Sequence, residues 1–354
     1  MSDSSSLTIS SSTGQYGVTV AASGFTQLLV DDPDALLIVD QRFELLAELE
    51  GRRVLSIAAD EQHKTLSEVE RLLIALRELG AGRSDRLVAV GGGVVQDVAT
   101  LTAQLYMRGL PWKYAPTTLL GMVDSCIGGK SSINAGAFKN LVGSFYPPAE
   151  ILVDPSFLQT LPDEAIAAGL AEATKISYCR GPETFESYLG LESNFGGDPE
   201  ALILHSLETK RWFIEDDEFD TGSRRLLNFG HSFGHALEAA TGFAVEHGIG
   251  VALGMISAER FGTATGLGAA APELVAHAEL LARRGTGLGE AADRFDRSVF
   301  ERSFLADKKH GPDGLHLILP SASGSVAEVV AERSDEVVAA ATESVEAVLD
   351  TVTS

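Results

Sequence analysis

Short apolar runs and amphipathic helical patterns alternate through the first half of the chain, and this alternation restricts the fold more than any other feature. Runs rich in Leu, Ile, Val and Ala lie at residues 35–40, 53–60 and 86–93, and residues 66–80 carry apolar side chains at helical spacing. Parallel strands need a crossover connection, usually a helix, so this alternation favours a mostly parallel sheet. It predicts a Rossmann-like α/β lobe with ligands at the carboxyl ends of its strands.

Helical patterns follow one another with little strand signal from about Leu161 onward. The predicted fold class is therefore an α/β N-terminal Rossmann-like lobe plus an all-α C-terminal lobe, and the predicted domains are residues 1–160 and 161–354. Residues 1–15 are mostly polar, and we expect them to form a disordered tail. An apolar run at residues 314–320 predicts one late strand near the site.

The charge balance and hydropathy exclude two classes of partner. The chain carries a formal net charge of −23, whereas nucleic-acid binding depends on clustered Lys and Arg. No apolar run approaches the roughly 20 residues that span a bilayer. The first residues lack the basic and apolar parts of a secretory signal, so we expect a cytoplasmic protein. Its two cysteines, Cys126 and Cys179, are too few for a disulfide framework.

Glycines and acidic residues stand where the predicted strands end. Gly92 and Gly93 lie between an apolar run and a helical pattern, where backbone N–H groups can approach a pyrophosphate. Their spacing does not match the dinucleotide fingerprint, so this turn alone is weak evidence. Asp40 ends another strand, in a place where a carboxylate can accept hydrogen bonds from a ribose, and Glu61 and Lys64 follow the next one.

The segment at residues 116–148 is more specific because it combines many polar groups with small residues. Small residues leave room for a ligand, and hydroxyl, carboxylate, ammonium and amide groups together suit a phosphorylated polyol. A purely structural loop would bury these charges without obvious partners. The polar residues are Thr117, Thr118, Asp124, Lys130, Lys139 and Asn140.

Candidate metal ligands lie in the helical half. Glu172 and Lys175 are three residues apart on one helical face, and His231 and His235 are four apart on another, with His247 following. One carboxylate and two imidazoles with an open fourth position are typical of a catalytic zinc site. Two histidines four apart are more often structural, but these three come from only eight in the chain. Spacing alone does not decide which two are ligands.

Four further polar residues precede these histidines. Lys210, Asp220, Arg224 and Asn228 lie in a stretch that also contains several solvated acidic residues. The planar guanidinium of Arg224 can bind a carboxylate or a phosphate through two parallel hydrogen bonds. The stretch is therefore a candidate for binding an anionic substrate.

Taken together, these motifs resemble 3-dehydroquinate synthase and the wider sugar phosphate cyclases. The similarity runs from about Leu36 to about Pro320, with the motifs in matching order and spacing. The strongest are GGGVVQD, YMRG, PTTLLGMVDSCIGGK, KNLVGSFYPP, FLQTLP, GLAEATK and RLLNFGHSFGHALE.

The resemblance implies zinc, or cobalt in its place, held by Glu172, His231 and His247, with His235 near the substrate. It implies catalytic or proton-transfer roles for Lys130, Lys175, Lys210, Asp220, Arg224 and His235. It implies substrate contacts from Arg108, Asp124, Asn140, Asn228 and one of Lys308 and Lys309. It implies NAD contacts from Asp40, Glu61, Lys64, Gly92, Gly93, Asp97, Thr117, Thr118, Lys139, Phe157, Thr160 and Leu161.

The family's reaction converts a phosphorylated seven-carbon ketose acid to a carbocycle. NAD takes a hydride, phosphate leaves by elimination, the hydride returns, and an intramolecular aldol reaction closes the ring. Arg108 resembles the family arginine that reaches a neighbouring subunit's site, so the resemblance also implies a homodimer.

Several positions depart from the family pattern: Gln96 replaces Gly, Cys126 replaces Ser, Asp220 replaces Glu, and Pro147-Pro148 replaces a single proline. At the double proline and at Gly121, the sequence resembles that of cyclases that act on sedoheptulose 7-phosphate. At Arg224, Asn228 and His235 it instead resembles the pattern of enzymes whose substrate carries a carboxylate. We expect 3-deoxy-arabino-heptulosonate 7-phosphate or an amino analogue, with a sedoheptulose 7-phosphate cyclase and a metal-dependent polyol dehydrogenase as alternatives.

Overall fold

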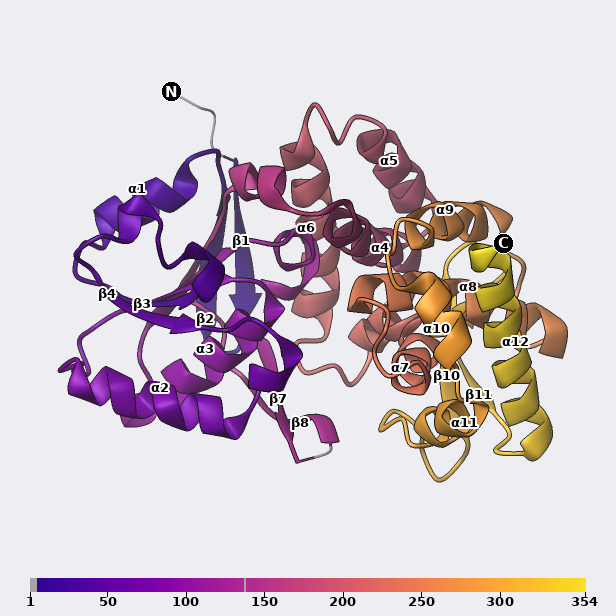
Figure 1. Cartoon of the computed structure of the whole chain (residues 1–354). Coiled ribbons are helices and arrows are strands. Elements are labelled where there is room, and N and C mark those ends of the chain that lie inside the picture. The colour runs from indigo at the N-terminus through magenta and orange to yellow at the C-terminus, as the bar shows by residue number, and fades with distance from the viewer. Residues whose placement is uncertain (1–4, 137) are drawn as a thin grey trace. The chain divides into compact units, whose positions relative to one another are not determined.

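The structure of the chain, a computed structural model, describes residues 5–136 and 138–354 (Figure 1). It divides into two compact units. The first consists of Met1–Leu161 and Asp198–Glu218, and the second of Pro162–Gly197 and Phe219–Ser354. The first unit is a mixed α/β sheet domain and the second is helical, which confirms the predicted fold class.

The first unit is built on one seven-stranded sheet. Its strands pair in parallel except for the antiparallel outer pair β1–β2. The fully buried central strands consist almost entirely of aliphatic residues, as expected for strands covered on both faces. In spatial order the strands are β1 (Ser5–Ser11), β2 (Gly14–Val20), β9 (Glu150–Val153), β6 (Trp112–Pro116), β5 (Leu87–Gly91), β3 (Leu36–Asp40) and β4 (Arg53–Ile57).

Helices and one hairpin complete this unit. Helix α2 begins where the Thr65 side chain accepts a hydrogen bond from the Glu68 N–H, a standard N-cap. On one face of the sheet, α1 buries Phe25 and Leu28 against Val39 and Val90 of the central strands. The elements are α1 (Gly24–Asp31), α2 (Leu66–Glu78), α3 (Gly93–Leu105), α6 (Pro199–Asp216) and the hairpin β7 (Lys130–Ala135) and β8 (Phe138–Phe145).

The predicted disordered tail at residues 1–15 is wrong for its described part, which forms β1 and begins β2. Leu7 and Ile9 are buried, while Ser6, Thr8 and Ser10, which alternate with them, are exposed. This is the two-residue period of a half-buried strand, hidden in a segment whose overall composition is polar.

Helix α6 covers the outer edge of β1. The Ser10 N–H donates to a carboxylate oxygen of Glu215 at 2.9 Å, and the Ser12 N–H donates to Glu218 at 2.7 Å. The Arg211 guanidinium donates to the Thr8 carbonyl at 3.4 Å. These side chains satisfy backbone groups that an edge strand otherwise leaves open.

The second unit is a cluster of helices with one small hairpin, so the late strand expected at residues 314–320 is present. Its helices are α4 (Asp163–Arg180), α5 (Pro182–Glu192), α7 (His231–Ala240), α8 (His247–Thr265), α9 (Pro272–Ala282), α10 (Leu288–Arg294), α11 (Arg297–Leu305) and α12 (Asp335–Thr353). The hairpin is β10 (Leu315–Pro320) and β11 (Val326–Ala331). No helix in the described part of the chain is long and apolar enough to cross a membrane.

Glycines let α8 approach its neighbours closely. A Cβ atom at Gly254 would lie 2.0 Å from the Gly230 carbonyl oxygen, which precedes α7, and one at Gly248 would lie 2.3 Å from the Ala168 carbonyl of α4. Only glycine fits at such contacts. The close packing brings the first turn of α8 beside α4 and α7, where the candidate metal ligands lie.

Candidate active site

The predicted cofactor residues of the first unit lie at the carboxyl ends of five adjacent parallel strands. The chain runs from β3 to β4 and then returns to β5 on the other side of β3, so the connections reverse between β3 and β5. Such a reversal opens a crevice where α/β sheets bind ligands. The residues are Asp40 at the end of β3, Glu61 and Lys64 after β4, Gly92, Gly93 and Asp97 after β5, Thr117 and Thr118 after β6, and Phe157, Thr160 and Leu161 after β9.

Asp40 already has protein partners. Its buried carboxylate accepts hydrogen bonds from the Arg42 N–H at 3.0 Å and from the Arg42 side chain at 2.9 and 2.5 Å. The carboxylate therefore caps the short helix Gln41–Phe43 and holds a cation at the strand end.

A charged network joins this strand edge to the β7–β8 hairpin. Lys64 pairs with Asp97 at 2.7 Å and donates to the side-chain oxygen of Asn140 at 2.9 Å. Burial raises the pKa of Asp97, and the Lys64 charge opposes that rise. Asn134, which sequence reasoning missed, donates to Glu61 at 2.8 Å and accepts from the Asn140 N–H. Lys139, on the same hairpin, lies 3.7 Å from Glu61.

Lys210 and Asp124 form a second buried contact in the first unit. The Lys210 ammonium lies 2.5 Å from the Asp124 carboxylate and donates to the Asp124 and Ile127 carbonyls at 2.6 and 3.3 Å. Asp124 belongs to a single π-helical turn, Gly121–Ser125, a rare conformation often found at functional sites. Lys130 follows at the start of β7 and is half-buried.

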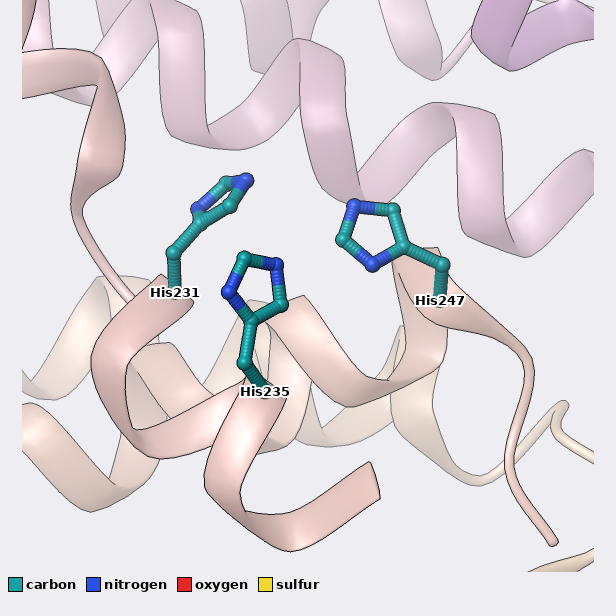
Figure 2. A group of neighbouring side chains, drawn as sticks. All are labelled: His231, His235 and His247. Carbon is teal, nitrogen blue, oxygen red and sulfur yellow. The ribbon is translucent and has the colours of Figure 1, made fainter. Parts of the chain in front are cut away.

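The three histidines of the helical unit converge. His231 and His235 lie one turn apart on α7, His247 opens α8, and their rings gather between the two helices (Figure 2). One ring nitrogen from each lies within 4.8 Å of the others, a group that could hold a metal ion.

Glu172 of α4 adds a carboxylate to this group. One of its oxygens lies 3.4 Å from His247 Nε2 and 3.8 Å from His231 Nε2. Ligands about 2.1 Å from a tetrahedral zinc ion lie about 3.4 Å from one another, so these spacings suit one cation. The other oxygen binds Lys175. Burial by itself raises the pKa of Glu172, but Lys175 and His247 outweigh it and hold the pKa low.

Hydrogen bonds orient both imidazoles toward Glu172. His231 Nδ1 lies 3.1 Å from the Phe229 carbonyl and His247 Nδ1 lies 2.8 Å from the Glu238 carboxylate. Both partners are acceptors, so each Nδ1 carries a hydrogen. Burial opposes ionisation of His247, but the Glu238 and Glu172 carboxylates outweigh it and raise the pKa of His247 well above its ordinary value, so this ring must give up a proton when it binds a metal. Burial and the Lys175 charge hold the pKa of His231 well below its ordinary value, so that ring is neutral, as a metal ligand must be.

Glu238 was missed from the sequence, although one signal was available. It lies seven residues after His231 on the same helix, and a spacing of seven keeps both residues on one face. A carboxylate on the ligand face of such a helix is a typical partner for a metal-binding histidine.

The late loop places one lysine near the histidines. The Asp307 carboxylate accepts from the Ser232 hydroxyl at 2.7 Å, and Lys309 lies 2.8 Å from the same carboxylate oxygen. Lys309 is half-buried whereas Lys308 is exposed. Burial acts against ionisation of Asp307, but Lys309 outweighs it and lowers the pKa to about 2.

Unusual backbone conformations mark several predicted site residues. Arg224 lies buried in the short helix Ser223–Asn228, and the Asn228 amide donates to the Arg225 carbonyl at 2.9 Å. Arg108, Asn140 and Asp220 have φ angles of 72, 52 and 63°, in the left-handed region that non-glycine residues rarely adopt. Such conformations cost about 1–3 kcal/mol and cluster at functional sites.

Comparison with known proteins identifies the family. Residues 54–168 match the model of the 3-dehydroquinate synthase N-terminal domain, and residues 169–310 match the model of its C-terminal domain. The chain is 37% identical over 292 residues to a 3-dehydroquinate synthase of a Sulfurovum species, covering 79% of this chain and 80% of the relative. It is 38% identical over 295 residues to that of Methylococcus capsulatus, covering 81% of each chain.

Solved structures agree on the fold. A 2-deoxy-scyllo-inosose synthase complexed with carbaglucose-6-phosphate, NAD+ and Co2+ superposes with a TM-score of 0.78 at 23% identity, over 97% of this chain and 99% of the other. A Streptomyces hygroscopicus 2-epi-5-epi-valiolone synthase with NAD+ and Zn2+ gives 0.77 at 24%, over 96% of each. A probable glycerol dehydrogenase of Sinorhizobium meliloti gives 0.60 at 15%, over 95% and 97%. The chain belongs to the 3-dehydroquinate synthase family, within the sugar phosphate cyclases, and is a carbon–oxygen lyase that eliminates phosphate.

Proposed function

We propose that the chain converts 3-deoxy-arabino-heptulosonate 7-phosphate to 3-dehydroquinate with release of phosphate. The observation that carries this proposal is the convergence of Glu172 with His231 and His247, within a chain 37–38% identical to named 3-dehydroquinate synthases. The bound NAD+ and Zn2+ or Co2+ belong to structurally similar cyclases. This chain's own donor groups support the same two cofactors.

The ligand set that we propose for the cation is Glu172, His231 and His247. His235 is the alternative third imidazole, because its ring also lies within the group. Lys175 binds one oxygen of Glu172, so only the other oxygen is left to face the imidazoles. That oxygen lies 3.4 Å from Nε2 of His247 and 3.8 Å from Nε2 of His231. We therefore assign His235 to the substrate side, where it can move a proton to or from a hydroxyl through water. When bound, the cation would polarise a substrate hydroxyl, and NAD would accept and return a hydride.

Other residues of the second unit fit an anionic substrate. The guanidinium of Arg224 suits a carboxylate because it can donate two parallel hydrogen bonds. Asn228, three residues later in the same short helix, offers an amide, and Lys309 brings a positive charge next to α7. These cations matter because the whole chain is strongly acidic and repels an anion at long range.

We assign NAD binding to the crevice at the carboxyl ends of β3, β4, β5, β6 and β9, and the remaining substrate contacts to Asp124, Lys130, Asn140 and Lys210. The glycines at the N-terminus of α3 suit the pyrophosphate. We further propose a homodimer to which Arg108 contributes across the subunit boundary. Arg108 is exposed and has a left-handed backbone conformation, which supports this role, and the mass of the particle in solution tests the dimer.

Two alternative activities can be distinguished from this one by their substrates and products. A sedoheptulose 7-phosphate cyclase would act on a substrate without a carboxylate, which leaves Arg224 without its expected anion. A polyol dehydrogenase would release NADH, whereas a cyclase regenerates NAD in each turnover. The two relatives described above, at 37% and 38% identity, are both named 3-dehydroquinate synthases, which favours the acid substrate.

The test incubates the purified protein with NAD and Zn2+ and either the heptulosonate phosphate or sedoheptulose 7-phosphate. We expect phosphate release and a product of the mass of 3-dehydroquinate from the first substrate only. The absorbance at 340 nm should not increase, because no NADH accumulates. The Glu172→Gln variant is the control that should lose this activity. Phosphate from sedoheptulose 7-phosphate alone, or net NADH from a polyol, contradicts the proposal.

A further inference from the structure

A chain of alternating charges lies on the second unit, beyond the groups assigned above. His316 of β10 stands between two carboxylates: its Nδ1 lies 2.8 Å from Glu328 of β11, and its Nε2 lies 2.9 Å from Asp313. The same Glu328 oxygen lies 2.6 Å from the Arg225 guanidinium. The order of groups is therefore Asp313, His316, Glu328 and Arg225.

The two ends of this chain belong to two proposed substrate-binding segments. Arg225 lies in the short helix Ser223–Asn228, next to Arg224, and its carbonyl accepts the Asn228 amide at 2.9 Å. Asp313 lies in the loop at residues 306–314, which carries Lys308 and Lys309. We call residues 306–314 the lysine loop.

The hairpin between these segments is anchored independently. The His316 N–H donates to His310 Nδ1 at 3.1 Å, and His310 Nε2 donates to the Phe304 carbonyl at 2.9 Å. At the other end, the Ser325 hydroxyl donates to the Cys179 carbonyl at 2.8 Å. These hydrogen bonds hold the hairpin, one of them through His310 of the lysine loop itself, and the charged chain adds a link from the hairpin to the segment with Arg224.

The number of protons on His316 decides how many of these contacts exist. A neutral imidazole has one N–H and donates to one carboxylate only, whereas an imidazolium has two and donates to both. Asp313 and Glu328 raise the pKa of His316 above its ordinary value of about 6.5. The link is therefore complete at low pH and loses one hydrogen bond as pH rises through that raised value.

Among the described residues, the titratable and charged groups beside His316 are the two carboxylates, Arg225 next to Glu328, and His310, which accepts the His316 N–H. Burial lowers the pKa of His310, so this imidazole stays neutral where His316 titrates. His316 lowers the pKa of Asp313, with a smaller contribution from Arg225, so this carboxylate stays ionised throughout the range in which the imidazole titrates. Hence the imidazolium is the group whose charge changes near neutral pH, and the other charges supply the field that holds it.

We propose that His316, Glu328 and Arg225 are positioning residues that couple the lysine loop to the Arg224 segment and tighten substrate binding when His316 is protonated. This inference rests on the proposed function, because it assigns both segments to the same anionic substrate. The three residues touch no reacting atom. Their effect is expected in KM rather than in kcat.

The first experiment measures KM and kcat of the NAD- and metal-loaded enzyme from pH 6 to 9 with the heptulosonate phosphate. As pH rises through the titration of His316, the ratio of the wild-type KM to that of His316→Gln should rise by about three- to fivefold. This is the change expected for the loss of one partly exposed ion pair. His316→Gln should show the higher KM at pH 6 and no step of its own. Glu328→Gln and Arg225→Ala should raise KM similarly, and Arg225→Lys should restore most of the loss.

A matched control is Arg297→Ala. Arg297 pairs with Glu346 at 3.0 Å on the surface of the same unit, so its loss removes a comparable ion pair from another part of the helical cluster. This variant should leave KM unchanged at every pH. An equal effect from Arg297→Ala, or a fall in kcat with constant KM in the three variants, overturns the proposal.

Hydrogen exchange of the lysine loop separates this inference from the proposed function. Residues 306–314 should exchange faster at pH 9 than at pH 6, after correction for the intrinsic pH dependence, and His316→Gln should remove the difference. This readout needs no substrate. If the wild type turns over no heptulosonate phosphate but the exchange follows His316, the proposed function fails and the coupling stands. An equal pH dependence of exchange in the wild type and in His316→Gln overturns the coupling.

Discussion

At the scale of single residues, the helical unit buries an acid–base pair away from the proposed metal ligands. Glu192 at the end of α5 lies 3.1 Å from Nε2 of His277 on α9. Burial raises the pKa of Glu192 to about 7, with Arg284 opposing, and burial lowers the pKa of His277 to about 4. Both shifts favour neutral groups, so the contact is between a protonated carboxyl group and a neutral imidazole and is not an ion pair.

This pair predicts a pH-dependent gain in stability for Glu192→Gln. The folded-state pKa of Glu192 is raised, so folding becomes less favourable as pH rises from about 4.5 to about 7, and the full cost remains above pH 7. The amide of the variant carries no charge at any pH and so avoids that cost. Urea unfolding should show the variant more stable than wild type by about 1 kcal/mol at pH 8 and nearly equal at pH 5. An equal difference at both pH values contradicts the assignment.

Glu238 predicts an effect on metal affinity. Because its carboxylate accepts from His247 Nδ1, Glu238→Gln should weaken zinc binding by about 10–100-fold, measured by competition with a chromophoric chelator. Glu273→Gln, an exposed change on α9, is the control and should bind zinc like the wild type. Unchanged affinity in Glu238→Gln would remove His247 from the ligand set.

At the scale of elements, the buried strands were predictable and their surroundings were only partly so. The strands β3 and β5 follow apolar runs because burial on both faces leaves little choice of residue. The end strand β4 also follows an apolar run, although most of its residues are only half-buried. The strand β1 was missed because Ser and Thr lower its mean hydropathy, although Leu7 and Ile9 alternate. The helix α6 was predictable as a helix, but periodicity does not reveal that its partner is β1 in the first unit.

The same limit applies to the site. Chemistry-bearing residues were found because few other residues offer their groups, and the family motifs narrowed the ligand set. The partners that orient them were not found, because pairs such as Asp307 with Ser232 are distant in sequence and leave no local signal. Glu238 was also missed, although it shares a helical face with His231 and so did leave a local signal.

Helix packing predicts a sharp contrast between two glycines. Gly254→Ala would place a methyl group 2.0 Å from the Gly230 carbonyl, so it should cost about 3 kcal/mol and weaken metal binding by displacing α7. Gly190→Ala on α5 meets nothing within 4 Å and should stabilise the helix by about 0.5–1 kcal/mol. Thermal unfolding and zinc titration measure both. Equal stability of the two variants contradicts the packing described.

At the scale of the whole molecule, the cation is expected to add to stability as well as to activity. A ligand that binds only the folded state stabilises it by mass action, by about 4 kcal/mol at a thousandfold excess over Kd. Chelation should therefore abolish phosphate release and lower Tm by about 5–15 °C, and Zn2+ or Co2+ should restore both. A constant Tm, after metal analysis has verified removal, would argue against a site made of three protein ligands.

The contact between α6 and β1 also bears on how the protein is made. The first and last pieces of the α/β unit are separated by nearly two hundred residues, and a helical segment of the other unit is translated between them. During synthesis the backbone groups at the outer edge of β1 stay without these side-chain partners until Arg211, Glu215 and Glu218 have left the ribosome. A fragment that stops at Leu161 lacks this closure for good, so it should associate edge to edge while the full-length chain does not.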